Sequence, residues 1–141
     1  LDNLEGENVE EAVGLALRQA RALYPQIGEG REYQTLVCRF VSDEQIRPFF
    51  YIKEGAVCRE WETVDRQGQT RRIDRLILGS QEIWVADFKS SREPAADYFH
   101  QVGAYMHIVR DLFPGKVVRG FLLYIDTCAA EEVFLNETAG F

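Results

Sequence analysis

The stretch RRIDRLILGSQEIWVADFKSS, residues 71 to 91, places Asp74, Asp87 and Lys89 among the apolar residues of two strand-like segments. Successive side chains of a strand point to opposite faces of a sheet. Asp87 and Lys89 therefore share one face with Val85, and the residues between them share the other. Charged groups within apolar strands need a partner, so these three side chains are candidates for a functional site.

The turn between the two segments determines whether Asp74 and Asp87 meet. A two-residue loop of Ser80 and Gln81, or a four-residue loop over 79 to 82, sets Asp74 directly opposite Asp87 in an antiparallel pair. Either loop therefore predicts two carboxylates side by side.

The preceding hairpin extends this row of acidic side chains. A three-residue loop over 66 to 68, with Gly68 in the left-handed conformation, sets Glu60 opposite Asp74. A bulge would move this pairing by one residue. The register therefore predicts a third carboxylate, Glu60, beside the first two.

A row of carboxylates is unfavourable without compensation. Two unit charges about 5 Å apart repel by roughly 3 kcal/mol at an effective dielectric constant of about 20. A divalent cation between them, or a carboxyl group kept protonated by a raised pKa, would relieve the repulsion. Oxygen ligands suit magnesium or manganese. The alternative is a set of ordinary ion pairs, Asp74 with Arg72 or Arg75 and Asp87 with Lys89.

The elements around this stretch indicate an α/β fold. The periodicity predicts helices over 9–24, 33–46 and 95–113, and strands over 56–64, 70–78, 82–89, 117–125 and, at an edge, 131–136. We expect one domain over residues 1–141, with a mixed four- to five-stranded sheet that begins as an antiparallel meander and is flanked by helices.

Composition restricts the class of protein. The net charge is −7, so the overall field repels a nucleic-acid backbone and any contact with DNA must be local or assisted. Three widely spaced cysteines, Cys38, Cys58 and Cys128, form no CxxC pair and favour a reducing, cytoplasmic setting. No apolar run approaches the roughly 20 residues of a membrane span, so no membrane partner is expected. The first residue is Leu1, which suggests a fragment of a longer protein.

Three motifs in combination resemble a known family. The pattern RRIDRLIL, WVADFKSS and YFHQVGAYMHIV is similar to the PD-(D/E)xK nuclease domain at the C-terminal end of RecB- and AddA-type helicase–nuclease subunits, within the restriction-endonuclease-like superfamily. The likeness covers about residues 57 to 125. It implies a metal-dependent DNA nuclease, an exonuclease of DNA repair and recombination in the bacterial cytosol.

The resemblance also implies roles for single residues. Asp74, Asp87, the backbone carbonyl of Phe88 and Glu60 would hold Mg²⁺ or Mn²⁺. Lys89 would orient or activate the attacking water, while Gln101 and Tyr105 would support the site and approach the DNA backbone. The implied partners are a single-stranded DNA end delivered by a helicase module, the rest of the parent polypeptide and a partner subunit.

The sequence departs from the family at one ligand. RecB-type nucleases contribute a metal-ligating histidine from an upstream helix, and this chain has none before His100. Either that ligand precedes Leu1 or the domain lacks it. Some relatives carry four cysteines for an iron–sulfur cluster, and no cluster is expected here.

Several candidates have a structural alternative. Gln101 lies in an apolar helical stripe, where an unpaired amide costs about 1 to 3 kcal/mol, so Lys89, a water, a phosphate or a backbone group should satisfy it. Tyrosines such as Tyr98 and Tyr105 are more often core aromatics with a hydrogen-bonded hydroxyl than site residues. Arg72 and Arg75 either hold phosphates or balance acids. His100 and His107 are expected to face solvent.

The sequence is also compatible with a second function. The same fold could be a catalytically inactive remnant that docks or guides DNA inside a helicase. A working site should bind manganese and cleave single-stranded DNA, whereas a remnant should do neither.

Overall fold

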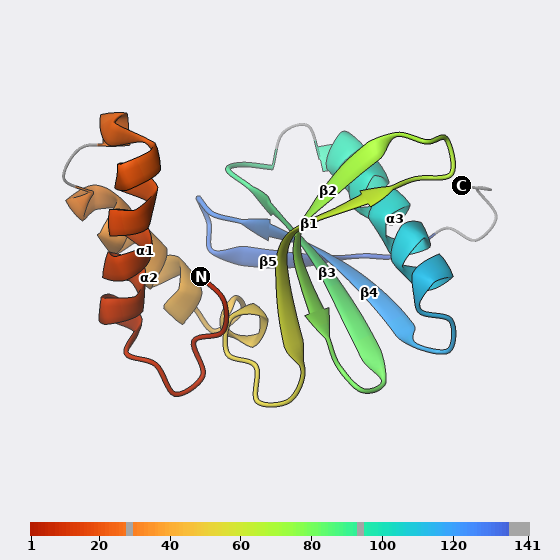
Figure 1. The fold of residues 1–141 in the computed structure, drawn as a ribbon, viewed down its shortest axis with the longest axis horizontal. Helices are drawn as coiled ribbons and strands as arrows, with labels where there is room; N and C mark the ends of the chain where they lie inside the picture. Colours follow the sequence, from red (N-terminus) through yellow and green to blue (C-terminus); the bar gives the residue numbers. More distant parts are fainter. Residues whose placement is uncertain (28–29, 93–94, 136–141) are drawn as a thin grey trace. The chain divides into compact units, whose positions relative to one another are not determined.

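The computed structural model describes residues 1–27, 30–92 and 95–135. They form two compact units, Leu1–Lys53 and Glu54–Phe141, each described here by itself (Figure 1). A single domain over 1–141 stays a prediction.

The first unit consists of helices. It contains α1 (Val9–Leu23), η1 (Pro25–Ile27), α2 (Arg31–Ser42) and η2 (Arg47–Phe49). Asn8 caps α1, since its side chain accepts a hydrogen bond from the Glu11 amide at 3.1 Å. The helix predicted over 9–24 is confirmed.

The C-terminal end predicted for the helix over 33–46 was wrong. The helix ends at Ser42, because Asp43 is extended (φ −64°, ψ 140°) and its carboxylate accepts a hydrogen bond from the Gln45 amide at 2.9 Å. An Asp side chain that bonds its own downstream backbone competes with helix continuation. Ile46, expected on that helix, is fully buried beyond it.

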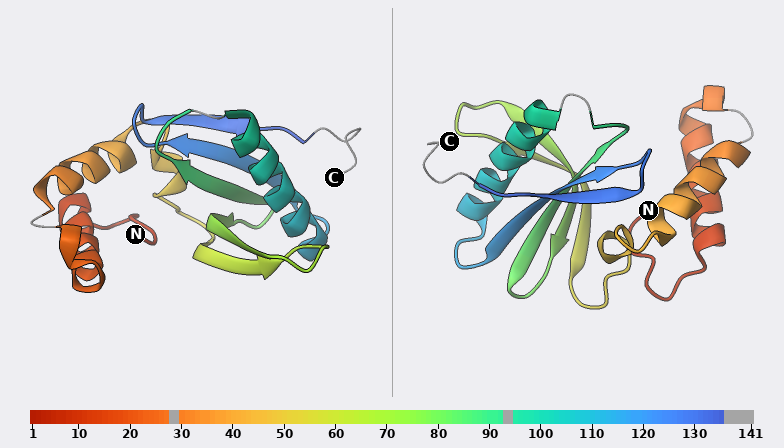
Figure 2. Two further views of the ribbon diagram at one scale, coloured as in Figure 1. Left: turned by 90° about the horizontal axis from the view of Figure 1, so that it is seen from above. Right: turned by 180° about the vertical axis from the view of Figure 1, so that it is seen from behind.

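The second unit is a five-stranded open mixed sheet with one long helix. Its strands are β1 (Ala56–Val64), β2 (Thr70–Leu78), β3 (Glu82–Lys89), β4 (Val117–Tyr124) and β5 (Ala129–Val133), in that spatial order. All neighbours pair antiparallel except β3 and β4, which are parallel. A parallel pair needs a crossover, and α3 (Ala95–Leu112) supplies it across one face of the sheet (Figures 1 and 2). The expected α/β class and mixed sheet are confirmed.

The bounds of the strands follow the sequence pattern closely. The first three match the predicted ranges, and β4 and α3 each end one residue early. The edge strand predicted over 131–136 runs instead over Ala129–Val133, and residue 136 lies outside the described residues.

The two hairpins have the predicted turns. Gly68 has φ +80°, and the Asp65 amide donates to the Gln69 carbonyl at 2.9 Å, which closes the three-residue loop. In the second hairpin Leu78 pairs with Ile83 around Ser80 and Gln81. Both registers are therefore those that the sequence predicted.

Helix α3 packs closely on β4 at Gly120. A Cβ atom at this position would lie 2.7 Å from Val102 Cγ1 and would also collide with the sulfur of Met106. Val102 and Met106 are both buried residues of α3. The absence of a side chain at 120 thus permits the helix to cover the face of the sheet that carries the charged residues.

We predict that Gly120→Ala destabilises the protein by about 1–3 kcal/mol, the usual cost of overpacking a filled core. The midpoint of urea unfolding measures the effect. Gly14→Ala in α1 is the matched control, because its Cβ would meet nothing closer than 3.7 Å and helix propensity favours alanine. Equal midpoints for Gly120→Ala and the wild type would contradict the close packing.

Within residues 1–27, 30–92 and 95–135, no helix has both the length and the apolar character needed to cross a membrane.

Candidate active site

Asp74 and Asp87 lie on neighbouring strands at the point where main-chain pairing stops. The β2–β3 ladder runs from Leu78 and Ile83 to Arg75 and Ala86, and its next position would join Asp74 to Asp87. At this position a side chain replaces the main-chain contact between the strands, because Asp74 Oδ2 accepts a hydrogen bond from the Phe88 amide at 2.9 Å. The two acidic residues therefore face the same side of the sheet, as the hairpin predicts.

Asp87 is a buried carboxyl group. It is 3% exposed, and its Oδ2 accepts no hydrogen bond from the described residues, although Lys89 Nζ lies 2.9 Å away as an ion-pair partner. Burial raises the pKa of Asp87 to about 6, with the neighbouring Asp74 charge adding to the rise and Lys89 opposing it. A buried acceptor with this proton affinity suits either a proton or a cation.

Lys89 is held between β3 and α3. Its Nζ donates to Gln101 Oε1 at 2.8 Å and lies 4.6 Å from the centre of the Tyr98 ring. The amide of Gln101 in turn donates from Nε2 to the Tyr105 hydroxyl at 3.0 Å. The expectation that Gln101 finds a partner in Lys89 is thus confirmed, and the chain of contacts fixes the ammonium group beside the two carboxylates.

The Tyr105 hydroxyl belongs to the same group. Burial raises its pKa, and the Asp87 carboxylate raises it further, with Gln101 acting in the opposite direction. The hydroxyl therefore keeps its proton near neutral pH and can donate it in a hydrogen bond.

Glu60 does not join the two aspartates. The β1–β2 pairs on either side, Arg59 with Arg75 and Trp61 with Ile73, keep the predicted register. Glu60 itself is unpaired in this ladder, has φ +49° and is exposed. Within the described residues, no group of three or more His, Cys, Asp or Glu side chains could hold a metal ion.

The two candidate arginines lie on different faces. Arg72 is exposed and shares the strand face of Asp74. Arg75 points to the opposite face and is 1% exposed, so it does not face the carboxylates. Of the two, only Arg72 is placed to meet a substrate at this site.

The sequence pattern missed Tyr124. It pairs with Lys89 in the parallel β3–β4 register, and its buried hydroxyl has no hydrogen-bond partner within the described residues. Its pKa is raised by burial and then by Glu131, while the Arg92 guanidinium lies 5.1 Å from its ring. The strand 117–125 is almost entirely apolar, so no sequence signal separated this tyrosine from the core.

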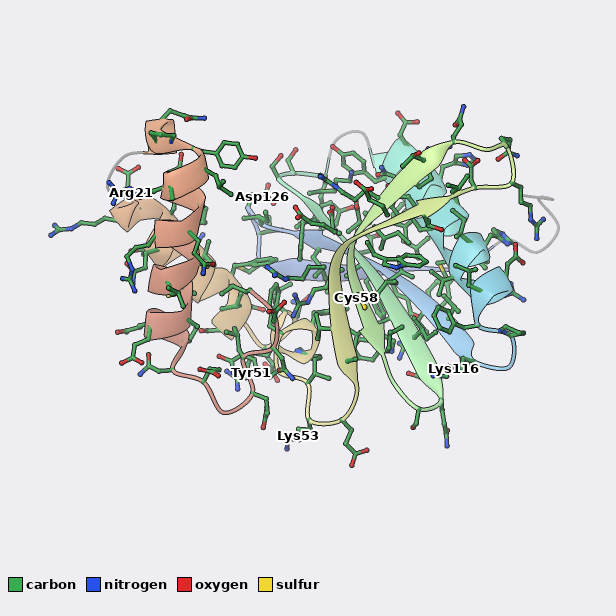
Figure 3. The ribbon with its side chains drawn as sticks, in the orientation of Figure 1. Arg21, Tyr51, Lys53, Cys58, Lys116 and Asp126 are labelled. Carbon is green, nitrogen blue, oxygen red and sulfur yellow. The ribbon has the colours of Figure 1, made fainter. Side chains whose placement is uncertain are left out.

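The site lies at one end of the sheet. Lys116 and Asp126 flank the two ends of β4 (Figure 3). Lys116 Nζ donates to the Gly79 carbonyl at 2.9 Å, at the β2–β3 turn, whereas the Asp126 amide donates to the carbonyl of Ser90, next to Lys89. The carboxylates and Lys89 belong to the Asp126 end, where β3 finishes.

The donor set fits a hard divalent cation. Asp74 and Asp87 offer carboxylate oxygens from adjacent strands, and the buried Oδ2 of Asp87 has Lys89 Nζ, 2.9 Å away, as its ion-pair partner. Mg²⁺ is commonly bound through one or two carboxylates, with water and substrate phosphate completing its shell. Asp74 and Asp87 are therefore the residues that could hold Mg²⁺ or Mn²⁺. The chain matches no protein-family model and no curated protein.

Proposed function

We propose that the chain is a magnesium- or manganese-dependent deoxyribonuclease. One observation carries the proposal: a buried carboxylate, Asp87, lies beside Asp74 on the next strand and 2.9 Å from the ammonium group of Lys89. A divalent cation held by two carboxylates, with a lysine beside it, can supply the activated water and the charge stabilisation of metal-assisted phosphodiester hydrolysis.

The chemistry divides among the residues as follows. A cation held by Asp74 and Asp87 supplies Lewis acidity, which lowers the pKa of a water and offsets charge on the phosphate. Lys89 orients the attacking water and donates a hydrogen bond to the phosphate oxygen on which negative charge accumulates. Gln101 positions Lys89 through the 2.8 Å contact, and Tyr105 in turn holds Gln101. Arg72 and Tyr105 then meet the DNA backbone.

The resemblance to RecB- and AddA-type nuclease domains supports the same activity and suggests a wider setting. By that resemblance the sheet belongs to the restriction-endonuclease-like fold, and the chain is part of a cytoplasmic helicase–nuclease of DNA repair and recombination. A net charge of −7 disfavours unaided capture of DNA. Delivery of a single-stranded end by the helicase module would overcome this repulsion, with exonucleolytic cleavage as the result.

A catalytically inactive module is the second candidate. It is favoured by the position of Glu60. The site contains two carboxylates, Asp74 and Asp87, whereas the sequence predicted three. Such a module would guide DNA or dock within a helicase and would have no response to metal.

Metal-dependent cleavage distinguishes the two candidates. End-labelled single-stranded DNA is incubated with Mn²⁺ and the wild-type chain or its Asp87→Ala variant, and products are resolved on a denaturing gel. The nuclease proposal expects cleavage by the wild type that EDTA abolishes and that the variant lacks. Equal cleavage by Asp87→Ala would remove the proposal, and calorimetry that detects no Mn²⁺ binding would favour the inactive module.

A further inference from the structure

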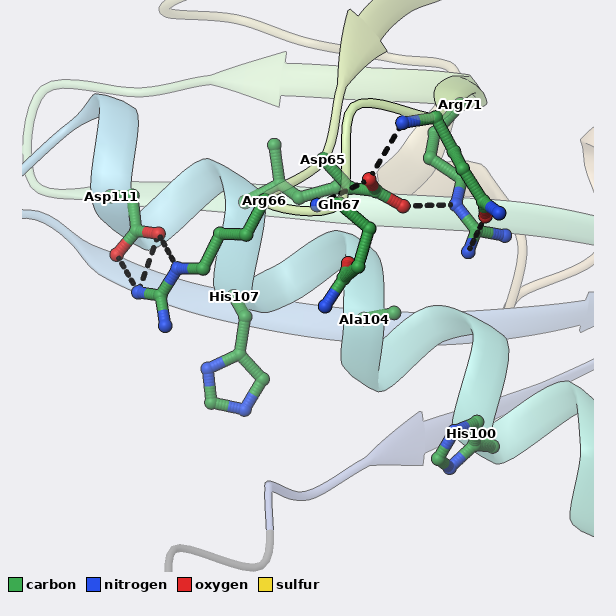
Figure 4. A pocket seen from close by; sticks show the side chains of 10 residues that line it. Asp65, Arg66, Gln67, Arg71, His100, Ala104, His107 and Asp111 are labelled. Atoms are coloured by element: carbon green, nitrogen blue, oxygen red, sulfur yellow. Dashed lines mark hydrogen bonds and ion pairs between the residues drawn. The ribbon is translucent and has the colours of Figure 1, made fainter. Parts of the chain in front are cut away.

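A second feature of the sheet unit is a pocket between the β1–β2 hairpin and α3. It has a volume of about 580 Å³, within the range typical of small-molecule sites. The hairpin contributes Gln67 and Gln69, and the helix contributes His100, Ala104, His107 and Ile108. In Figure 4 Gln67 extends from the hairpin toward Ala104 of the helix.

The charges around this pocket compensate one another. Arg66 forms a bidentate pair with Asp111, at 2.7 Å for its closest contact, and Arg71 pairs with Asp65 at 2.9 Å (Figure 4). Each arginine therefore already has a carboxylate partner. A phosphate would have to compete with these carboxylates, so the pocket suits an uncharged ligand.

The remaining lining combines apolar and hydrogen-bonding groups. Ala104 and Ile108 present apolar side chains from the helix, and Gln67 lines the same pocket with a side-chain amide from the hairpin. Burial lowers the pKa of His107, with Arg110 and Arg66 lowering it further against the opposing effect of Asp111, so its imidazole is neutral near pH 7. A side-chain amide can bond the edge of a nucleobase, and an imidazole ring or an apolar surface can pack against its flat face.

The pocket adjoins the candidate active site along α3. His100 and Ala104 of the pocket immediately precede Gln101 and Tyr105 of the site. Consecutive helical residues are separated by a rise of about 1.5 Å and about 100° of rotation, so the two sites occupy neighbouring faces of one helix. A nucleotide with its phosphate near Lys89 could thus direct its base, or the base next to it, into the pocket.

We propose that this pocket binds a nucleobase of the DNA strand whose phosphate lies at Lys89. The inference rests on the proposed nuclease function and adds a subsite to it. The Arg66–Asp111 pair that ties the hairpin to the helix is well exposed, at 66% and 49% of the two side chains. Exposed ion pairs contribute little to stability, so the hairpin tip can shift to admit the base.

Two binding measurements without cleavage test the pocket. Deoxyribonucleosides are titrated into the isotope-labelled 141-residue chain, and single-stranded DNA with or without one abasic position is bound in EDTA. The proposal expects saturable NMR shifts at Gln67, Ala104 and His107, and DNA binding weakened about tenfold by an abasic residue at one position, as expected for loss of one stacked base.

Variants make the assignment specific. Gln67→Leu removes the amide and Ala104→Phe fills the pocket, and both should weaken nucleoside binding and abolish the abasic penalty. Gln81→Leu, at the exposed turn of the other hairpin, is the matched control and should leave both unchanged. Circular dichroism checks that each variant folds.

The outcomes separate the two proposals. Absence of saturable shifts, or an abasic strand bound as tightly as the intact one, overturns the base pocket even if the wild type cleaves DNA. Absence of Mn²⁺-dependent cleavage overturns the nuclease function, and the nucleoside shifts still report on the pocket.

Discussion

Replacing Lys89 by methionine is expected to slow cleavage of single-stranded DNA by about 10²- to 10³-fold, the usual effect of removing one donor to a developing negative charge. Methionine keeps most of the length of the side chain but has no ammonium group. The cation-binding carboxylates of Asp74 and Asp87 remain, so Mn²⁺ binding measured by calorimetry should be retained. Single-turnover rates at saturating Mn²⁺ measure the loss.

The control is a lysine at the other end of the sheet. Lys116→Met removes an ammonium group that donates to the Gly79 carbonyl and should leave the rate within a few-fold of wild type. If Lys89 were only the ion-pair partner of Asp87, Lys89→Met would lower the unfolding midpoint without a specific loss of rate in the folded protein. A variant that cleaves at the wild-type rate would exclude Lys89 from catalysis.

The position of Lys89 was predictable because strand periodicity and turn length are both local. Alternation placed Lys89 beside Asp87, and the loop of Ser80 and Gln81 fixed the register that brings Asp74 to the same site. These features depend on a few neighbouring residues, so the sequence alone determined them.

Glu60 was less predictable because its backbone departs from the strand while the register around it is preserved. A positive φ is uncommon for residues other than Gly, Asn and Asp, and nothing in CREWE signals one. Whether Glu60 pairs with β2 depends on the path of the β1 backbone in the folded sheet. Local sequence preference does not determine that path.

The pocket beside α3 was missed for a related reason. His100 and His107 were expected to face solvent because they lie on the polar side of an amphipathic helix. His100 is exposed, but His107 is half-buried since the β1–β2 hairpin reaches the same side of α3 through the Arg66–Asp111 pair. Contacts between a hairpin tip and a helix some 45 residues later in the chain leave no periodic signal in either segment.

In the metal-free protein, the contribution of Asp87 to the free energy of unfolding is expected to fall as pH rises from about 4 to about 6. The pKa of Asp87 is raised from 3.8 to about 6, first by burial and then by Asp74, against the opposing effect of Lys89; Tyr105 is the other titratable group that faces it. The folded protein thus binds this proton more tightly than the unfolded chain. The stabilising contribution is complete below about pH 4 and is lost as pH rises through about 6.

The size of the effect follows from the shift in pKa. A rise from 3.8 to about 6 corresponds to about 3 kcal/mol in the free energy of unfolding. Urea unfolding in EDTA across this pH range measures it. Asp87→Asn, which cannot ionise, should show a pH dependence smaller by about that amount, whereas Asp126→Asn, in the exposed turn after β4, should behave as the wild type does. Identical pH profiles for Asp87→Asn and the wild type would contradict the buried carboxyl.

Manganese should oppose this pH dependence. The cation binds the ionised form of Asp87, so it competes with the proton and gains affinity as pH rises. At about 100 times its dissociation constant a ligand stabilises the folded state by about 2.7 kcal/mol, which would offset most of the cost of ionising Asp87 near neutral pH. Mn²⁺ should therefore raise the unfolding midpoint at pH near 7.5 but hardly at pH near 4.5, and Asp87→Asn should lack the increase. An increase of equal size at both pH values, or in both proteins, would place the cation elsewhere than at Asp74 and Asp87.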